Sequence, residues 1–177
     1  MLSEPFDTYK EHKQYYPSKV ANDILSVNGL IDEVDWESAK SIKDFVQAEP
    51  NYGSIPSKKT EIKVLYDDQF LYIAVYLFDN PENIKKKNAI YDDWYEGFEN
   101  NSDYFVVEID SEHNHQQSYC FAVNSSGVQA DYTMYNDGYV DDDWNAAYWN
   151  AKTSIADDGW IIEYEIPFKI LEYHNYK

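Results

Sequence analysis

Two short stretches of alternating apolar residues flank a polar run in the middle of the chain. In residues 104–109 and again in residues 119–123, every second side chain is large and apolar, which is the period of a strand with one face in a core. The intervening residues 110–117 are polar throughout and predict a turn that brings the second strand back beside the first. The chain is therefore expected to be organised around a long antiparallel β-hairpin.

Further strands are predicted on both sides of this hairpin. Residues 60–66 alternate, whereas residues 70–78 are apolar on both faces, which requires a central strand covered on two sides and therefore two layers. Residues 128–135 predict another strand, and residues 151–156 and 160–166 predict a last hairpin. The predicted fold class is an all-β antiparallel β-sandwich with only short helical turns.

A few residues are expected to be structural. Asp35 is expected to N-cap a short helical turn at residues 36–39, which makes Trp36 an anchor at one end of the core. Trp160 is also assigned to the core, because it begins the apolar face of its strand. Cys120 is the single cysteine, so there is no disulfide framework, and its place within a strand predicts a buried, inert thiol.

Composition limits the partners of the chain. Its 177 residues include 33 acids against 14 basic residues, and the formal net charge is -19. Nucleic acid and anionic membrane surfaces would be repelled by such a chain, so neither is expected as a partner. All the basic residues are lysines, and the forked guanidinium that suits carboxylates and many sugar hydroxyls is missing. No apolar run approaches the length of a membrane helix, and direct membrane insertion is not expected.

Four motifs, taken in order, carry a resemblance to a known family. They are I-D-E-x-x-W, S-D-x-F, F-A-V-N and G-W-x-x-E-x-x-I-P-F. Over about residues 27–171 the chain resembles the carbohydrate-binding module family 9-like domain, in the version at the N-terminus of bacterial surface proteins that continue into a membrane region. We therefore expect residues 1–26 to be an N-terminal lead-in. Residues 27–177 are expected to form one jelly-roll-like β-sandwich that lacks its last strands.

The resemblance also implies a setting and a ligand. It implies an extracellular, cell-surface or periplasmic location, glycan or polysaccharide as the ligand, no catalysis, and structural Ca²⁺ as a common cofactor. Family members continue past the I-P-F segment with strands that close the sheet. A protein partner, or the rest of a longer chain, is therefore expected to supply closing strands here, because an uncovered sheet edge invites pairing.

The sugar clamp of the family is not reproduced in this sequence. Sugar-binding members carry a Trp just before the strand that matches residues 103–110, an acid within that strand, an Arg on the next strand and a second Trp beyond the I-P-F segment. The first three positions are Asn100, Val106 and Ala122 here. Of the site positions of the family, Asn124 is the one that this sequence keeps. A glycan site would have to be built from other residues.

Exposed aromatic rings are the best material for such a site. They lie in two acidic loops, expected at residues 91–101 and 136–144. Aromatic faces stack on sugar C–H groups while neighbouring Asp and Asn accept hydroxyl hydrogen bonds. The candidate ligand-binding residues are Trp94, Tyr95, Phe98, Asn124 and Trp144. The alternative is that these rings plug the ends of the sandwich, and this is the simpler interpretation for Trp149.

Two acidic segments are candidates for calcium. In the hairpin turn, Asp110 and Glu112 have the alternate spacing with which a loop presents oxygens to Ca²⁺, although His115 stands where an EF-hand needs glycine. The second segment crowds its acids so closely that a cation would relieve their repulsion. Its candidate ligands are Asp137, Asp141, Asp142 and Asp143. Plain surface charge is the alternative for both segments, and a transition metal held by His113 and His115 is a further one.

Two functional hypotheses follow. The leading one is a non-catalytic, carbohydrate-binding domain of a secreted or surface protein that binds glycan through exposed aromatic rings. The alternative is a protein-interaction or accessory domain of a bacterial envelope complex that has lost sugar binding. An enzyme is not expected, because acid pairs abound but no H-E-x-x-H, G-x-S-x-G, P-loop or C-x-x-C motif is present.

Overall fold

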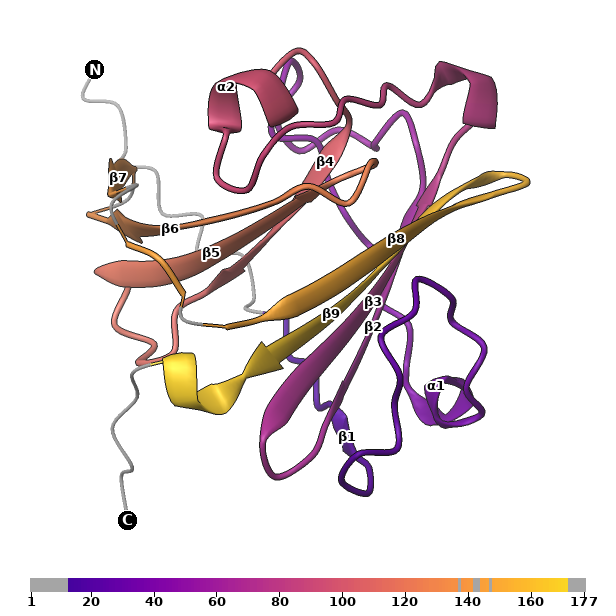
Figure 1. Ribbon diagram of the computed structural model, residues 1–177, viewed down its shortest axis with the longest axis vertical. Coiled ribbons are helices and arrows are strands. Elements are labelled where there is room, and N and C mark those ends of the chain that lie inside the picture. The colour runs from indigo at the N-terminus through magenta and orange to yellow at the C-terminus, as the bar shows by residue number, and fades with distance from the viewer. Residues whose placement is uncertain (1–12, 137, 142–143, 147, 172–177) are drawn as a thin grey trace, which may run out of the picture.

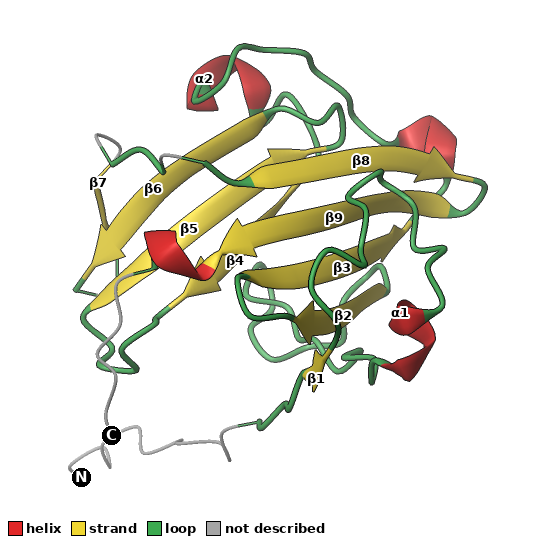
Figure 2. Ribbon diagram, turned by 60° about the horizontal axis from the view of Figure 1, so that its bottom comes forward, coloured by secondary structure: helices red, strands yellow, loops and turns green. Residues whose placement is uncertain are grey.

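The strands form two sheets that lie face to face (Figures 1 and 2). The computed structural model describes residues 13–171, except 137, 142–143 and 147. The five-stranded sheet consists, in spatial order, of β1 (Ser18–Lys19), β2 (Thr60–Tyr66), β3 (Phe70–Phe78), β9 (Gly159–Pro167) and β8 (Asn150–Ala156). The four-stranded sheet consists of β4 (Tyr104–Ile109), β5 (Gln117–Asn124), β6 (Gln129–Tyr135) and β7 (Tyr139–Asp141). Neighbouring strands are antiparallel except for the short β1–β2 pair, and the predicted antiparallel β-sandwich is confirmed.

The predicted central hairpin is formed by β4 and β5. Phe105 lies opposite Val123 and Val107 lies opposite Phe121, so the apolar positions of both strands share one face. All four side chains belong to the core between the sheets. The alternation in the sequence therefore predicted the position of this hairpin and which face of its strands is buried, and burial of that face fixes the register.

Strand β3 lies between β2 and β9 in the five-stranded sheet. Its residues Ile73 and Val75 pack in the core between the sheets. From its other face, Tyr72 and Ala74 pack beneath the N-terminal segment. The predicted coverage of this strand on two sides is confirmed.

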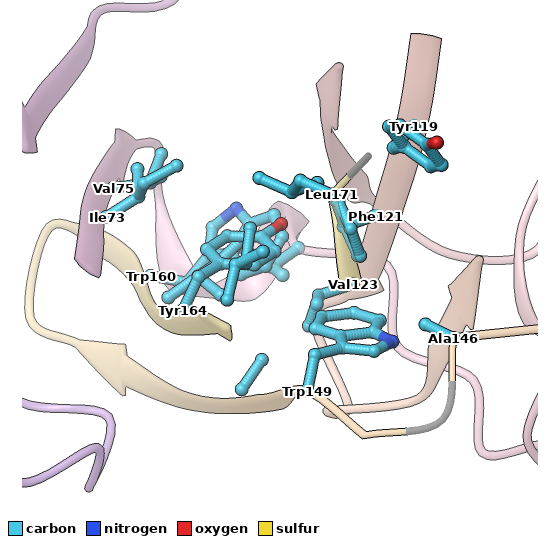
Figure 3. Packing of buried hydrophobic residues seen from close by; sticks show 14 residues of the cluster. Ile73, Val75, Tyr119, Phe121, Val123, Ala146, Trp149, Trp160, Tyr164 and Leu171 are labelled. Atoms are coloured by element: carbon cyan, nitrogen blue, oxygen red, sulfur yellow. The ribbon is translucent and has the colours of Figure 1, made fainter. Parts of the chain in front are cut away.

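The core between the sheets is rich in aromatic rings. Figure 3 shows Trp160 and Tyr164 of β9 packed among residues of β3 and β5. Tyr164 is fully buried, and its hydroxyl donates to the Phe105 carbonyl at 3.1 Å. Trp149 stacks on Tyr164 with ring centroids 6.0 Å apart. Each fully buried aromatic side chain contributes roughly 1.5–3 kcal/mol through its removal from water, so this layer dominates the stability of the fold.

Helix α1 (Asp35–Ser38) covers the outer face of the five-stranded sheet (Figure 1). Trp36 is 2% exposed there and packs with Tyr72 and Ala74, so it is buried as predicted, but on the outer face of this sheet and not at one end of the core between the sheets. The capping prediction was wrong: Val34 is the N-cap and no side chain caps the helix. Asp35 is already inside the helix, because the turn begins one residue earlier than the sequence suggested.

A buried carboxylate lies beneath this N-terminal segment. Glu163 of β9 is 2% exposed and accepts backbone N–H groups of Asn28 at 2.9 Å and Gly29 at 2.8 Å. Burial raises the pKa of Glu163 in spite of these donors. Gly29 has a φ of +88°, and a Cβ atom there would lie 3.0 Å from the Thr153 carbonyl carbon, so this close approach requires glycine.

Two smaller expectations were also decided by the structure. Cys120 is fully buried, which confirms its predicted burial, and loss of hydration raises the pKa of its thiol to about 11, which favours the protonated, less reactive form. The second acidic loop is partly a strand, because β7 extends the four-stranded sheet there. Within the described residues, no helix is long and apolar enough to cross a membrane.

Candidate functional site

Helix α2 (Trp94–Gly97) lies over the outer face of the four-stranded sheet (Figure 1). The side chain of Asp93 caps its first turn. The chain then turns Phe98 onto the sheet, where its ring is fully buried against Ala122 and Ala130. These small residues of β5 and β6 leave the room that the ring occupies. The irregular acidic loop expected here therefore contains a helical turn that covers the sheet.

Four aromatic rings form a cluster on this face: Trp94, Phe98, Tyr104 and Tyr132. Trp94 stacks on Phe98 with ring centroids 4.7 Å apart and planes inclined by 9°. It meets Tyr104 and Tyr132 edge-on, at centroid distances of 5.5 and 5.6 Å. Stacked and edge-to-face pairs at these distances are favourable, so three neighbours hold the Trp94 ring in one orientation.

The surface beside Trp94 is hollowed into a pocket of about 230 Å³. It is lined by Asp92, Trp94, Ala130, Asp131, Tyr132 and Val140. The volume is below the roughly 300–1,000 Å³ of pockets that take drug-sized ligands, and it suits a single small ring. Two lining residues are aromatic, two are acidic and none is basic. The pocket therefore favours a neutral ligand that carries hydroxyl donors.

Asp92 is the exposed acid of this pocket. Its backbone is left-handed, with a φ of 61°, and its N–H donates to the Gln129 carbonyl at 3.1 Å. Its Oδ1 accepts the backbone N–H of Asp131 at 3.0 Å, and its Oδ2 accepts the side-chain amide of Asn145 at 2.9 Å. Loss of hydration, and then the nearby charge of Asp131, raise the pKa of Asp92. Each carboxylate oxygen still has a lone pair to offer to a ligand hydroxyl.

Asp131 is the buried acid of the pocket, with 3% of its surface exposed. Its Oδ1 accepts the backbone N–H of Ala146 at 2.8 Å, and its Oδ2 accepts the indole N–H of Trp149 at 2.8 Å. The hydroxyl of Tyr91 also donates to Oδ2. Three donors offset the hydration that a buried carboxylate loses. Asp131 therefore shapes the pocket from behind, with its carboxylate occupied by the protein itself.

The candidate aromatic residues lie in different places. Trp94 lines the pocket, whereas Tyr95 is 73% exposed on the same helix and outside the pocket lining. Phe98 is fully buried. Trp144 lies against the opposite face of the sheet, where its ring centroid is 5.1 Å from that of Tyr119 in the core. Trp94 and Trp144 therefore cannot stack on the same sugar.

Asn124 is fully buried and bonded within the protein on both sides of its amide. Its Nδ2 donates to the carbonyls of Lys87 at 2.9 Å and Gly97 at 2.6 Å. Its Oδ1 accepts the N–H groups of Ser126 and Val128, both at 2.9 Å. These four bonds use the whole hydrogen-bonding capacity of the amide, so Asn124 fastens the segment around α2 to β5.

The clamp positions of the resemblance are covered by the same helix. Val106 and Ala122, where the resemblance places an acid and an Arg, belong to the apolar cluster with Phe98. Asn100 follows α2 and is exposed. The surface on which the family clamp would stand is therefore filled by Phe98, and the pocket lies to one side of it.

The hairpin-turn residues proposed for calcium are engaged within the turn. Asp110 accepts the backbone N–H groups of His115 at 2.7 Å and Asn114 at 3.2 Å. Partial burial opposes ionisation of Asp110, but these donors outweigh it and its pKa is lowered. Glu112 accepts the side-chain amide of Asn114 at 3.2 Å. The rings of His113 and His115 lie edge to face, with centroids 5.1 Å apart.

The second proposed calcium segment is described only in part. Asp141 lies in β7, whereas Asp137, Asp142 and Asp143 lie outside the described residues. Among the residues that the structure describes, no group of three His, Cys, Asp or Glu side chains is placed to hold a metal ion. Calcium binding therefore stays a prediction for this segment.

Sequence reasoning missed Asp92, Asp131, Tyr132 and Val140 as pocket residues. A signal for Tyr132 was present, because it shares the outward phase of its strand with Ala130. Asp131 carried a signal too, since it is an acid at an inward position of a strand and a buried acid needs partners. Asp92 and Val140 carried no signal in the sequence, because one lies in the loop before α2 and the other in β7, and these segments are distant in sequence.

Comparison with known proteins identifies the fold. No family model matches the chain, and no curated protein matches it. A carbohydrate-binding module of family 9 from Caldicellulosiruptor kristjanssonii, in complex with cellotriose, matches with a TM-score of 0.56 at 15% identity, over 86% of this chain and 67% of that chain. This chain has the family 9 fold. The resemblance carried by the four motifs is thus confirmed at the level of the fold.

Two further structures match the chain. The same bacterium's module in complex with glucose matches with a TM-score of 0.56 at 15% identity, over 84% of this chain and 67% of that chain. A protein from Bacteroides uniformis that is described as carbohydrate-binding matches with a TM-score of 0.57 at 11% identity, over 77% of this chain and 63% of that chain. The chain therefore matches about two thirds of the length of each neighbour.

Proposed function

We propose that this chain is a non-catalytic module that binds a glycan at the pocket beside Trp94. The observation that carries the proposal is the pocket itself, which places the Trp94 and Tyr132 rings beside the exposed Asp92 carboxylate. The family 9 fold supports it, because two neighbours of that fold were solved with cellotriose or glucose. Fold alone does not transfer a ligand, so the proposal depends on the pocket.

The residues of the pocket divide the recognition of a sugar between them. The half-buried Trp94 ring offers an apolar edge and face to sugar C–H groups. Asp92 accepts hydrogen bonds from sugar hydroxyls with the lone pairs that Asp131 and Asn145 leave free. With two acidic residues in its lining and no cation, the pocket disfavours sugars that carry carboxylate or sulfate groups.

The state of the two acids supports binding without catalysis. Glycoside hydrolysis needs two carboxyl groups that flank the scissile bond, one to protonate it and one to attack or activate water. Asp131 is 3% exposed and already accepts three donors. Asp92 is then the one lining carboxylate of the pocket that can act on a ligand, and a binding module is the simpler function.

Substitution of the two half-buried tryptophans tests the proposal. Calorimetric titration of cellotriose and glucose into the purified chain should show binding, and Trp94→Ala should weaken it at least about tenfold, because an aromatic contact of ~1.5 kcal/mol or more is lost. Trp144→Ala is the matched control, since Trp144 packs on Tyr119 on the other side of the sheet, and its affinity should stay at the wild-type value. Unchanged binding by Trp94→Ala would remove the pocket from consideration.

Two further features of the proposal rest on the resemblance alone. We expect the module to act outside the cytoplasm, in the extracellular space, at the cell surface or in the periplasm, which cell fractionation with a tagged chain would check. We also expect Ca²⁺ to act structurally in the acidic segment around Asp141. Thermal unfolding with calcium and with a chelator tests that point, and an unchanged midpoint would contradict it.

A specific observation also favours the alternative, a protein-interaction domain. In the described part of the chain β4 has β5 as its one strand neighbour, so it presents an edge on its other side. The inward side chains of Phe105, Val107 and Ile109 are partly exposed there. Such an edge is a template for an added strand from a partner or from a longer chain.

Hydrogen exchange on β4 distinguishes this alternative. If a partner strand pairs with β4, the backbone N–H groups of β4 that point away from β5 exchange rapidly in the purified monomer and become protected in a complex or dimer. Light scattering gives the mass in parallel. A monomer whose β4 amides are already protected would contradict the alternative.

A further inference from the structure

The carboxylate of Asp131 gathers segments that are far apart in the sequence. Its donors are the Tyr91 hydroxyl from the segment before α2, and the Ala146 N–H and Trp149 indole N–H from the segment before β8. Asp131 itself belongs to β6. One buried side chain therefore joins the two connecting segments to the sheet that they flank.

The backbone of Asp131 continues this connection to the exposed side of the pocket. Its N–H donates to Asp92 at 3.0 Å, and Asp92 also accepts the Asn145 amide at 2.9 Å. The left-handed backbone of Asp92, with a φ of 61°, is disfavoured for a residue other than glycine. These bonds hold it there, two residues before Trp94.

We propose that Asp131 is the positioning residue of the glycan pocket. It does not touch the ligand, because its side chain is buried and its two oxygens already accept three donors. It fixes Tyr91 from behind, and its strand fixes Asp92, so that Trp94 reaches its place against Tyr132. This inference rests on the proposed function, and it gives Asp131 a role other than contact with the ligand.

A second buried carboxylate provides a matched control. Asp67 is 2% exposed, its Oδ1 accepts the N–H groups of Gln69 at 2.7 Å and Phe70 at 2.8 Å, and its Oδ2 accepts the Tyr72 hydroxyl at 3.0 Å. It thus has the same number of donors as Asp131, including one tyrosine, but it lies at the turn between β2 and β3. A change there removes an equivalent buried charge from the other sheet.

The experiment compares Asp131→Asn with Asp67→Asn. Both variants should unfold at a lower temperature than the wild type, because each leaves buried donors poorly paired. At a temperature at which both are folded, Asp131→Asn should bind cellotriose at least about tenfold more weakly, whereas Asp67→Asn should stay within about twofold. Wild-type affinity in folded Asp131→Asn would overturn the proposal.

A milder pair covers the case in which Asp131→Asn does not fold. Tyr91→Phe and Tyr72→Phe each remove one hydroxyl donor from the respective carboxylate. Tyr91 is 44% exposed and outside the pocket lining, so this variant should fold. Tyr91→Phe should weaken cellotriose binding several-fold, whereas Tyr72→Phe should leave the affinity unchanged. Equal affinities in the pair would overturn the proposal.

A readout without ligand separates this inference from the proposed function. Nuclear Overhauser contacts between the Trp94 and Tyr132 rings report whether Trp94 is in place. They should persist in Asp67→Asn and disappear in Asp131→Asn. If the wild type binds neither cellotriose nor glucose, the proposed ligand class fails while loss of these contacts still supports positioning by Asp131. If the contacts persist in Asp131→Asn, the positioning inference fails whatever the sugars do.

Discussion

The two outer faces of the sandwich are covered by the same device, with different results. On each face a four-residue helix, α1 or α2, carries a tryptophan over the sheet, and Figure 2 shows the two helices far apart on the molecule. A buried carboxylate bonds each covering segment: Glu163 accepts two N–H groups from the segment before α1, and Asp131, from an inward position of β6, accepts the Tyr91 hydroxyl from the segment before α2. Trp36 of α1 is sealed at 2% exposure, whereas Trp94 of α2 stays half-buried beside a pocket.

The difference between the two faces comes from what fills the space beneath each helix. Under α1 the tryptophan itself packs with Tyr72 and Leu65 in a closed cluster. Under α2 that position is taken by Phe98, which is fully buried, and Trp94 stacks on top of it. A second aromatic residue therefore lifts Trp94 towards solvent, and the same covering device becomes a surface that can bind a ligand.

The largest expected effect is on stability, and it should separate the two tryptophans. Trp36→Ala should lower the free energy of unfolding by about 3–5 kcal/mol, because it empties a sealed site. Trp94→Ala should lower it by only about 1 kcal/mol, since its side chain is already partly exposed to solvent. Urea unfolding followed by circular dichroism measures both. Similar losses in the two variants would show that the two coverings are equivalent after all.

Alternation in the sequence predicted most of the fold. The hairpin of β4 and β5, the two-sided β3 and the last hairpin each have a period that burial imposes directly. The one-turn helix α2 escaped prediction, because four residues carry no helical period and its acidic neighbours are typical of a loop. For α1 the turn was expected but its start was not, since Asp35 is a good capping residue that the structure nevertheless places inside the helix.

The candidate site was predicted less well than the fold. Trp94 was found because an aromatic ring in an acidic loop stands out, but Phe98 in the same loop is buried and Trp144 lies on the other side of the sheet. Which ring of a loop faces solvent depends on how the loop folds over the sheet, and composition does not encode it. Asp92 and Val140 meet only through the pairing of β6 with both neighbouring segments.

The buried carboxylate under α1 should make stability depend on pH. Glu163 has a raised pKa in the folded chain, so its contribution is fully present below its ordinary pKa of 4.5 and is lost as the pH rises through the folded value. The difference in unfolding free energy between the wild type and Glu163→Gln should therefore shift against the wild type as the pH rises above about 4.5. Urea titrations across this range measure it, and a difference that is independent of pH would refute it.

The smallest expected effects concern one lysine near each helix. Lys63 donates to the Trp36 carbonyl of α1 at 2.8 Å from a partly buried position, so Lys63→Met should cost about 1 kcal/mol. Lys87 pairs with Glu96 of α2 at 3.4 Å, with side chains 46% and 52% exposed, so solvent screens the pair and Lys87→Met should cost at most about 0.5 kcal/mol. Its backbone carbonyl, which accepts from Asn124, is unchanged by the substitution. If Lys87→Met costs as much as Lys63→Met, ion pairing holds α2 in place, and the aromatic stacking on Phe98 is not what orients Trp94.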